Sequence, residues 1–181
     1  MPDSVLSEGA GGPASLAKSD RILQDLAQLS AREAVVDVEE AREKIVIFAY
    51  ASDLYALPGR QVREILTVGE IWPVPGAPEF LPGLINIRGD IESVIDLRQL
   101  LGLAATAGRS SLVIVADTGA IRSGLLIDAM VDVVDVPVSA IEPPPSTLDD
   151  LRREFVVGVV SHEGRTIPLL NLDKAFARVL E

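Results

Sequence analysis

From residue 44 onward, the apolar residues come in short runs rich in valine and isoleucine, and Gly, Pro, Asp or Ser closes each run. Runs of this length between breakers are typical of β-strands. They are KIVIFAYAS, LYALP, RQVREILTV, LVIVADTG, IRSGLLIDA, MVDVVDV, REFVVGVVS and RTIPLL. The pattern predicts an all-β fold of many short strands. One proline-rich segment, IEPPPSTLDDL, interrupts the series and predicts a stiff loop.

An internal repeat organises these strands. The segment 83–101, GLINIRGDIESVIDLRQLL, aligns without a gap with 158–176, GVVSHEGRTIPLLNLDKAF, at an offset of 75. Two earlier pairs are also similar: IVIFA (45–49) with LVIVA (112–116), and VREIL (62–66) with MVDVV (130–134). We therefore expect two copies of one β unit, subdomain one at about 44–104 and subdomain two at about 110–180. Units of about 60 residues close only small cores, so the two are expected to pack together.

The repeated segments carry turn and cap residues at matching places. Gly89 and Gly164 each stand between two strands, where a tight turn needs a positive φ. Asp96 and Asn171 are both N-cap types, and each precedes a short stretch with helical character. Asparagine cannot replace a catalytic carboxylate but can replace a cap, so a structural role is expected for Asp96. Gly102 is expected to end the first of these stretches.

Residues 1–43 form an N-terminal extension outside both copies. Residues 1–19 are rich in Gly, Ala, Ser and Pro and show no periodicity, which predicts a disordered tail. Leucines and isoleucine at helical spacing predict an amphipathic helix over 20–33. We expect this helix to dock within its own chain rather than on a partner.

Charge and composition exclude several classes of protein. The net charge is −11 and no basic stripe is visible, so nucleic-acid binding is not expected. The chain has no cysteine, which excludes disulfides and thiolate metal sites. No signal peptide and no apolar run of about 18 residues are found, so direct membrane insertion is not expected. These features favour a cytoplasmic protein.

No set of residues indicates catalysis. His162 is the only histidine and has no second ligand at metal-binding spacing, so a structural or exposed position is expected. Asp128, Asp132 and Asp135 could bind a cation, but their spacing more simply places them at strand ends and on a solvated face. We therefore expect no catalytic residue, no metal and no cofactor.

Arg88 stands out because the fold does not require it. It lies in an apolar run, and its counterpart in the second copy is Glu163. One interpretation is an ion pair with Glu64, Asp90 or Glu92 that tethers the chain. The other is an interface arginine, since a planar guanidinium among apolar groups is a frequent hot spot in protein interfaces.

The stretch EFLPGLINIRGDIESVIDLRQLLGL resembles the motif of the CheW-type chemotaxis coupling proteins. Its hallmarks are a glycine before the strand, Asn-x-Arg-Gly at the turn, and an apolar strand that ends in Ile-Asp-Leu-Arg. YALPGRQVREIL, GLLIDAMVDVVDV and FVVGVVSHEGRTIPLLNLDKAF resemble further segments of the family, in the right order. The resemblance covers a CheW-like domain at 44–181.

The resemblance implies two five-stranded SH3-like β barrels packed together, without an active site. It implies an adaptor that couples the cytoplasmic tips of chemoreceptors to the regulatory domain of a CheA-type histidine kinase, at arrays on the inner face of the membrane. Barrel one would dock on the kinase domain, and an apolar groove near the junction of the barrels would take the receptor hairpin. The matching partner-binding positions are Val62, Glu64, Gly83, Asn86, Arg88 and Gly89.

Other functions stay open at this point. The chain could be a stand-alone regulatory domain like that of the kinase, although these 181 residues hold no ATP-binding segment. It could serve a non-flagellar chemosensory pathway. An enzyme that uses Glu64 with Asp90 ranks last, because no base or nucleophile accompanies the two carboxylates.

Overall fold

The computed structural model describes residues 40–104 and 112–180, so the expected tail at 1–19 and helix at 20–33 lie outside the described residues. Residues Ala41–Glu181 form one compact unit. The described part of this unit folds into two five-stranded sheets with a few short helices, which confirms the all-β prediction.

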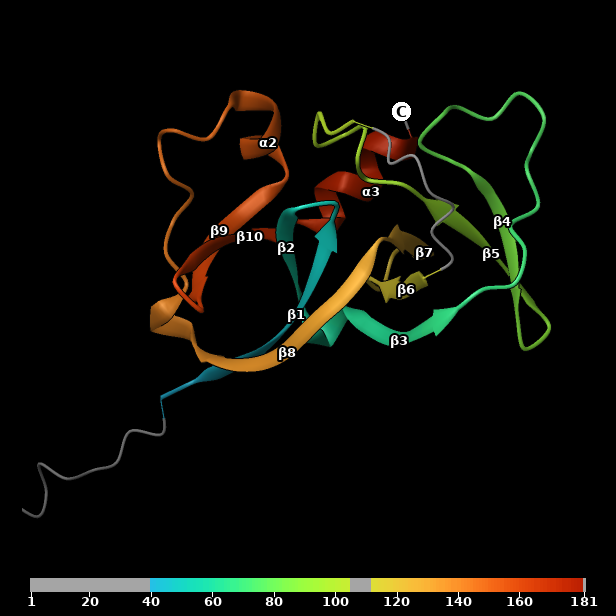
Figure 1. Cartoon of the computed structure of the whole chain (residues 1–181). Coiled ribbons are helices and arrows are strands. Elements are labelled where there is room, and N and C mark those ends of the chain that lie inside the picture. Colours follow the sequence, from blue (N-terminus) through green and yellow to red (C-terminus); the bar gives the residue numbers. More distant parts are fainter. Residues whose placement is uncertain (1–39, 105–111, 181) are drawn as a thin grey trace, which may run out of the picture. The chain divides into compact units, whose positions relative to one another are not determined.

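The two sheets have five strands each. Sheet A runs in the order β8 (Ala129–Pro137), β1 (Arg42–Tyr50), β2 (Asp53–Pro58), β10 (Arg165–Leu170) and β9 (Val156–His162). Sheet B runs in the order β3 (Val62–Thr67), β6 (Leu112–Asp117), β7 (Arg122–Ile127), β5 (Asp90–Ile95) and β4 (Gly83–Ile87). The helices are η1 (Gly59–Gln61), η2 (Val138–Ala140), α2 (Asp150–Glu154) and α3 (Leu172–Leu180). Figure 1 shows β9 and β10 on the left and the β4–β5 hairpin on the right.

Each sheet combines strands from both copies of the repeat. Sheet A takes β1 and β2 from the first copy and β8, β9 and β10 from the second. Sheet B takes β6 and β7 from the second copy and β3, β4 and β5 from the first. The two sheets have equivalent strand orders, in which β8, β1, β2, β10 and β9 of sheet A correspond to β3, β6, β7, β5 and β4 of sheet B. For example, β8 pairs with β1 in the way that β3 pairs with β6. The copies expected at about 44–104 and 110–180 are intertwined, and neither coincides with one sheet.

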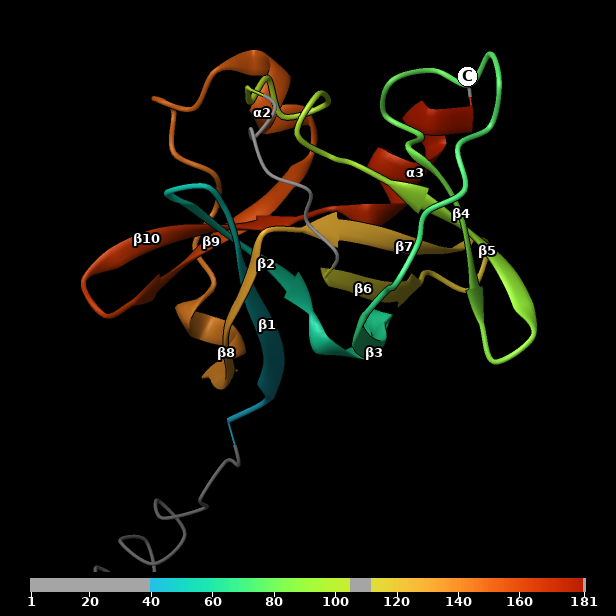
Figure 2. The ribbon, with the colours of Figure 1, turned by 45° about the vertical axis from the view of Figure 1, so that its right-hand side comes forward.

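A single bridge closes each sheet into a barrel. The chain leaves edge strand β3 and crosses to the opposite edge, where Trp72 and Leu84 exchange two backbone hydrogen bonds of 2.8 and 2.9 Å. After β8, Glu142 and Val159 do the same at 2.9 and 2.8 Å. Figure 2 shows the connection from β3 rising in front of sheet B towards β4. Closure protects the edge strands, which would otherwise expose unpaired backbone groups.

Alternation along the strands sorts the side chains into three cores. Ile45, Ile47, Ala56, Val160, Ile167 and Leu169 fill barrel A. Val68, Ile85, Ile87, Val94, Val113, Val115 and Leu126 fill barrel B. The positions between them form a larger third core, here called the junction cluster, to which both sheets and α3 contribute. Its members include Phe48, Tyr50, Leu57, Ile95, Ile114, Leu125, Leu170 and Phe176.

The cores test the alignment of the two copies. Ile85 and Val94 fill barrel B as Val160 and Leu169 fill barrel A, so the offset of 75 is correct for the hairpins. The match of 45–49 with 112–116 is wrong by one residue. Barrel A is filled from positions 45 and 47, whereas barrel B is filled from 113 and 115. A shift of one residue moves every side chain of a strand to the opposite face, and the similar letters of the two runs concealed it.

The two capped stretches end differently. Asn171 caps α3 as expected, because its side-chain oxygen accepts a hydrogen bond of 3.1 Å from the amide of Lys174. The expected helix after Asp96 is only a turn. The amide of Leu103 bonds to the carbonyl of Arg98 at 2.8 Å around Gly102, whose φ is 64°. This left-handed glycine stops the helix after one turn, as proposed for Gly102.

Candidate partner-binding surface

The predicted binding residues centre on the tip of the β4–β5 hairpin. Ile87 pairs with Asp90, so the turn holds only Arg88 and Gly89, with φ of 56° and 102°. Two positive φ values identify a primed hairpin turn. The side chain of Asn86 accepts a 2.8 Å hydrogen bond from the amide of Gly89 and fixes this turn. Arg88 therefore projects from a tip and is not embedded in the apolar strand.

Of the three carboxylates considered for Arg88, the structure pairs it with Glu64. The guanidinium Nη2 lies 2.8 Å from Glu64 Oε2, and 81% of the Arg88 side chain is exposed. In barrel A the counterpart of Arg88 is Glu163, and the carboxylate on the edge strand is met instead by His162, the last residue of β9, whose Nε2 lies 3.2 Å from Asp132 Oδ2. In each barrel a side-chain nitrogen near the end of the hairpin thus meets a carboxylate on the edge strand. Such exposed contacts stabilise a fold by less than about 1 kcal/mol.

Both edge strands carry a bulge at equivalent positions. Val62 and Glu64 pair with consecutive residues of β6, which leaves Arg63 unpaired. Met130 and Asp132 pair with consecutive residues of β1, which leaves Val131 unpaired. A bulge bends an edge strand and turns its side chains away from the regular ladder. In barrel B the bulge residue forms an ion pair of 3.1 Å with Asp117, whereas Val131 is 46% exposed.

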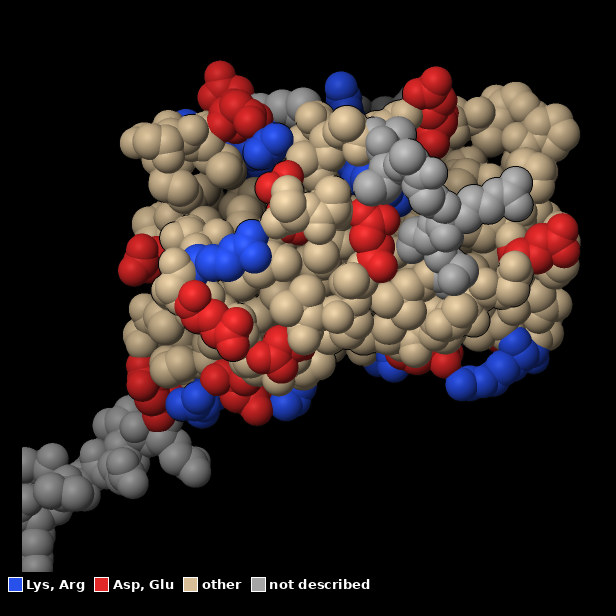
Figure 3. All heavy atoms as spheres, viewed as in Figure 1, with Lys and Arg blue, Asp and Glu red and all other residues tan. Residues whose placement is uncertain are grey.

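An apolar surface follows β3 and β8 beside the junction of the barrels. We call it the junction surface and define it by Val62, Ile65, Leu112, Met130 and Val133. The first four are partly buried against the junction cluster, and Val133 is 47% exposed. Figure 3 shows a broad uncharged area over β8 and β3, with acidic side chains gathered towards the start of β1. Apolar area of this kind, rimmed by polar groups, is typical of protein contact sites, so this surface is a candidate for partner binding.

A buried arginine joins the barrels. Arg98 is 5% exposed; its Nε lies 2.9 Å from Asp96 Oδ1 and its Nη1 lies 3.1 Å from Asp128 Oδ1. Its guanidinium carbon stands 5.2 Å from the ring centre of Tyr50. Burial disfavours the charged form, but the hydrogen bond and charge of Asp96, aided by Asp128, raise the pKa of Arg98 above its usual value. The amide of Ala51 donates a 2.7 Å hydrogen bond to Asp128 Oδ2 and extends the network to the β1–β2 turn.

Sequence reasoning missed this network. Asp128 was expected on a solvated face, but it accepts hydrogen bonds from Arg98 and from the backbone. Asp132 and Asp135 have other partners, His162 and Lys44, so the three carboxylates act separately. The available signal was the Asp-x-Arg spacing after β5, since a side chain can reach a neighbour two residues away around a cap. Within the described residues, no group of three or more His, Cys, Asp or Glu could hold a metal ion.

The structure brings only some of the six predicted binding residues together. Glu64 and Arg88 form one ion pair, and Asn86 and Gly89 build the turn that presents it. Val62 lies on the junction surface. Gly83 is buried, and a Cβ there would lie 2.2 Å from the Trp72 carbonyl oxygen, so the bridge that closes barrel B explains this glycine. Partner binding by these residues stays a prediction.

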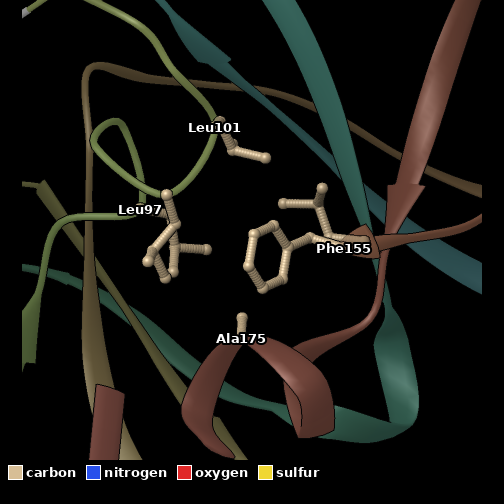
Figure 4. A pocket seen from close by; sticks show the side chains of 6 residues that line it. Leu97, Leu101, Phe155 and Ala175 are labelled. Atoms are coloured by element: carbon tan, nitrogen blue, oxygen red, sulfur yellow. The ribbon is translucent and has the colours of Figure 1, made fainter. Parts of the chain in front are cut away.

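A small apolar pocket lies where the ends of the two copies meet. Its lining is Leu97, Leu100, Leu101, Phe155, Leu170 and Ala175. Figure 4 shows the Phe155 ring between the turn that carries Leu97 and Leu101 and the helix that carries Ala175. The lining residues offer no polar side chain to orient a ligand, so we interpret the pocket as a small gap between packed side chains and not as a ligand site.

Comparisons with known proteins agree with this geometry. The profile of the CheW-like domain family matches residues 44–180. A "Chemotaxis protein CheW" from Rhizobium meliloti is 34% identical, over 74% of this chain and 86% of that protein. The "Protein FrzA" of Myxococcus xanthus is 33% identical, over 65% of this chain and 75% of that protein.

Structure and sequence lead to the same family. The crystal structure of the scaffolding protein TtCheW from Thermoanaerobacter tengcongensis superposes with a TM-score of 0.64 at 33% identity, over 72% of this chain and 90% of that one. Among the described residues, no helix is long and apolar enough to cross a membrane. Two intertwined barrels, the Asn-x-Arg-Gly hairpin tip and the match over 44–180 together show that the chain belongs to the CheW-like domain family.

Proposed function

We propose that this protein is a non-catalytic scaffold that couples the cytoplasmic tips of chemoreceptors to a CheA-type histidine kinase. The observation that carries the proposal is the junction surface, an apolar area between two rigid barrels with the Glu64–Arg88 pair on the edge strand beside it. The relatives named as chemotaxis and scaffolding proteins support it. In this role the protein acts at receptor arrays on the inner face of the membrane.

The receptor contact falls on the junction surface. A receptor tip is a helical hairpin, and an amphipathic helix places its apolar face against an apolar strip of this kind. Val133 on β8 is 47% exposed, so burying the remainder of its side chain against a partner contributes about 1 kcal/mol, roughly half of the value for a fully exposed valine. Arg88 keeps Glu64 in place and leaves most of its own guanidinium accessible for a second contact.

Reconstitution with purified kinase and receptor tips tests this proposal. The parent protein should bind both and raise kinase activity in the assembly. Val133→Glu should weaken receptor binding at least about tenfold, because it introduces a charge into an apolar contact. Arg88→Glu should weaken assembly by about 2 kcal/mol, because it removes one interface charge and introduces the opposite one.

The second copy of the repeat supplies the control. Glu163 occupies the tip of the β9–β10 hairpin with a φ of 49°, close to the 56° of Arg88. Glu163→Arg should leave assembly and the melting temperature unchanged. Phosphoryl transfer by the protein without the kinase would contradict the scaffold function, and so would equal binding by the parent, Val133→Glu and Arg88→Glu.

A further inference from the structure

A histidine and an aspartate meet at the bulge of edge strand β8. His162 Nε2, at the end of β9, lies 3.2 Å from Asp132 Oδ2. The other oxygen of the same carboxylate, Oδ1, accepts a 2.7 Å hydrogen bond from the amide of Val133. Asp132 directly follows Val131, the residue that the bulge leaves unpaired. One carboxylate therefore connects the β9–β10 hairpin with the backbone of the bulge.

The equivalent contact in barrel B has a different cation. Glu64 takes the place of Asp132 in the aligned edge strand, and it pairs with Arg88. An arginine stays charged throughout the physiological range of pH, so this pair is permanent. Histidine is the side chain that ordinarily gains or loses its proton between about pH 5 and pH 8. The contact on β8 therefore changes its charge in a range where the contact on β3 does not.

The charged side chains near His162 leave Asp132 as its ion-pair partner. Those on the neighbouring elements are Asp132 on β8, Glu163 in the turn, Arg165 on β10 and the Lys44–Asp135 pair of β1 and β8. Arg165 lies opposite His162 in the hairpin, but its Nη2 is 2.9 Å from the carbonyl oxygen of Ser52. The chain has one histidine and no cysteine, so protonation of His162 is the change in side-chain charge to expect near neutral pH.

We propose that His162 is a pH-sensitive residue that adjusts the junction surface through β8. Nε2 faces a carboxylate and therefore carries the hydrogen of the neutral ring, so a proton taken from water binds Nδ1. The ring then carries a full positive charge, and its hydrogen bond with Asp132 becomes an ion pair. The ion pair holds the carboxylate more firmly against the amide of Val133, and this fixes the bulge.

The position of Val133 gives this change a consequence for binding. Val133 is a 47% exposed member of the junction surface. A segment that is already fixed loses less conformational freedom when a partner binds. Acidic pH should therefore strengthen binding at the junction surface. This consequence rests on the proposed function, whereas the effect on the β8 backbone does not depend on it.

Amide spectra of the isolated 181-residue chain, labelled with ¹⁵N, test the effect on β8. Between about pH 5.5 and pH 8, we expect the Val131 and Val133 amides to shift along one titration curve and the Ile65 amide of barrel B to stay in place. His162→Gln should abolish these shifts and Asp132→Asn should largely remove them, so the test does not depend on the folding of a single variant. His162→Arg carries a permanent charge and should hold both valine amides near their acid positions at every pH. Unmoved valine amides in the parent, or shifts that persist in His162→Gln, would overturn the inference.

Titrations with a receptor-tip peptide at about pH 6 and pH 8 test the effect on binding. Because the peptide has titratable groups of its own, each parent affinity is divided by the affinity of His162→Gln at the same pH. We expect this ratio to be about threefold higher at the acidic pH, since exposed ion pairs contribute little. An equal ratio at the two pH values would refute the control of the junction surface by His162 and leave the proposed function standing. If the peptide binds at neither pH, the proposed function and the binding consequence both fail, and the amide titration alone decides the effect on β8.

Discussion

The tips of the β4–β5 and β9–β10 hairpins share one backbone and carry opposite chemistry. Both are two-residue turns with positive φ at each position. Arg88 of the first turn pairs with Glu64 on bulged β3, whereas beside the second turn it is the strand residue His162 that meets Asp132 on bulged β8. The first hairpin carries Arg88 at its tip, with Ile91 exposed and Trp72 at the closing bridge near its base. The second carries Glu163 at its tip, with Thr166 and Glu142 at the corresponding places. Because the fold is satisfied equally by either set, the differences between the barrels are the part of the sequence that is free to serve partners.

The two copies of the repeat differ most at a buried position, Arg98. Its counterpart at the offset of 75 is Asp173, an exposed residue near the start of α3 whose carboxylate lies 3.4 Å from Gln61. Arg98→Ala leaves Asp96 and Asp128 without their buried cation and should lower the free energy of unfolding by about 3 kcal/mol. Urea denaturation measures this loss. Asp173→Ala is the control, and equal effects of the two variants would show that Arg98 does not join the barrels.

The closing bridges provide the next test. A Cβ at Gly83 would lie 2.2 Å from the Trp72 carbonyl oxygen, whereas one at Gly158 would lie 2.8 Å from the Glu142 carbonyl oxygen. Overpacking costs about 1–3 kcal/mol, so Gly83→Ala should lie near the upper end and Gly158→Ala lower in this range. Thermal melts of both variants check the order. Small and equal decreases in the melting temperature would mean that both bridges adapt to the added methyl group and that barrel closure does not depend on their close packing.

The two cap residues, Asn171 and Asp96, differ in the number of hydrogen bonds that they accept. The side chain of Asn171 accepts its hydrogen bond from Lys174 in its own helix, so Asn171→Ala should cost about 1 kcal/mol. Asp96 accepts hydrogen bonds from both the amide and the side chain of Arg98, so Asp96→Ala should cost about 2 kcal/mol. Chemical denaturation of the two variants measures the difference. A smaller loss of unfolding free energy for Asp96→Ala than for Asn171→Ala would contradict this difference between the two copies.

Removing the charged contacts near the ends of the two hairpins should have the smallest effect on the free energy of unfolding. Glu64→Gln and Asp132→Asn each weaken one exposed contact and should change the free energy of unfolding by less than about 1 kcal/mol. Partner binding at about pH 8 should then distinguish them, because we expect only Glu64→Gln to weaken assembly with the receptor and kinase at this pH. Parallel melts and titrations make this comparison, and a loss of assembly in both variants would refute it.

Local sequence patterns predicted those structural features that depend only on residues close together in the chain. The strand class, the turns at Gly89 and Gly164 and the cap at Asn171 follow from short-range backbone chemistry, and the structure confirms them. The exchange of the β1–β2 and β6–β7 hairpins between the sheets was not predicted, because alternation shows which face of a strand is buried and does not show which strand pairs with it. Arg98 was missed for a related reason. Its buried position depends on Asp128 and Tyr50, which are remote in sequence and become neighbours only when the barrels pack.

The exchange of strands has a consequence for how the chain folds. Among the described residues, barrel A contains both the first strand, β1, and the last, β10, so it cannot be completed until the chain from Arg42 to Leu170 has been synthesised. Its contacts join residues far apart in sequence, and chains of such high contact order fold slowly. Neither half can fold by itself, since each would leave two sheets incomplete. Cutting the chain between β5 and β6 should therefore give two fragments that are unfolded alone and assemble into one protein when mixed.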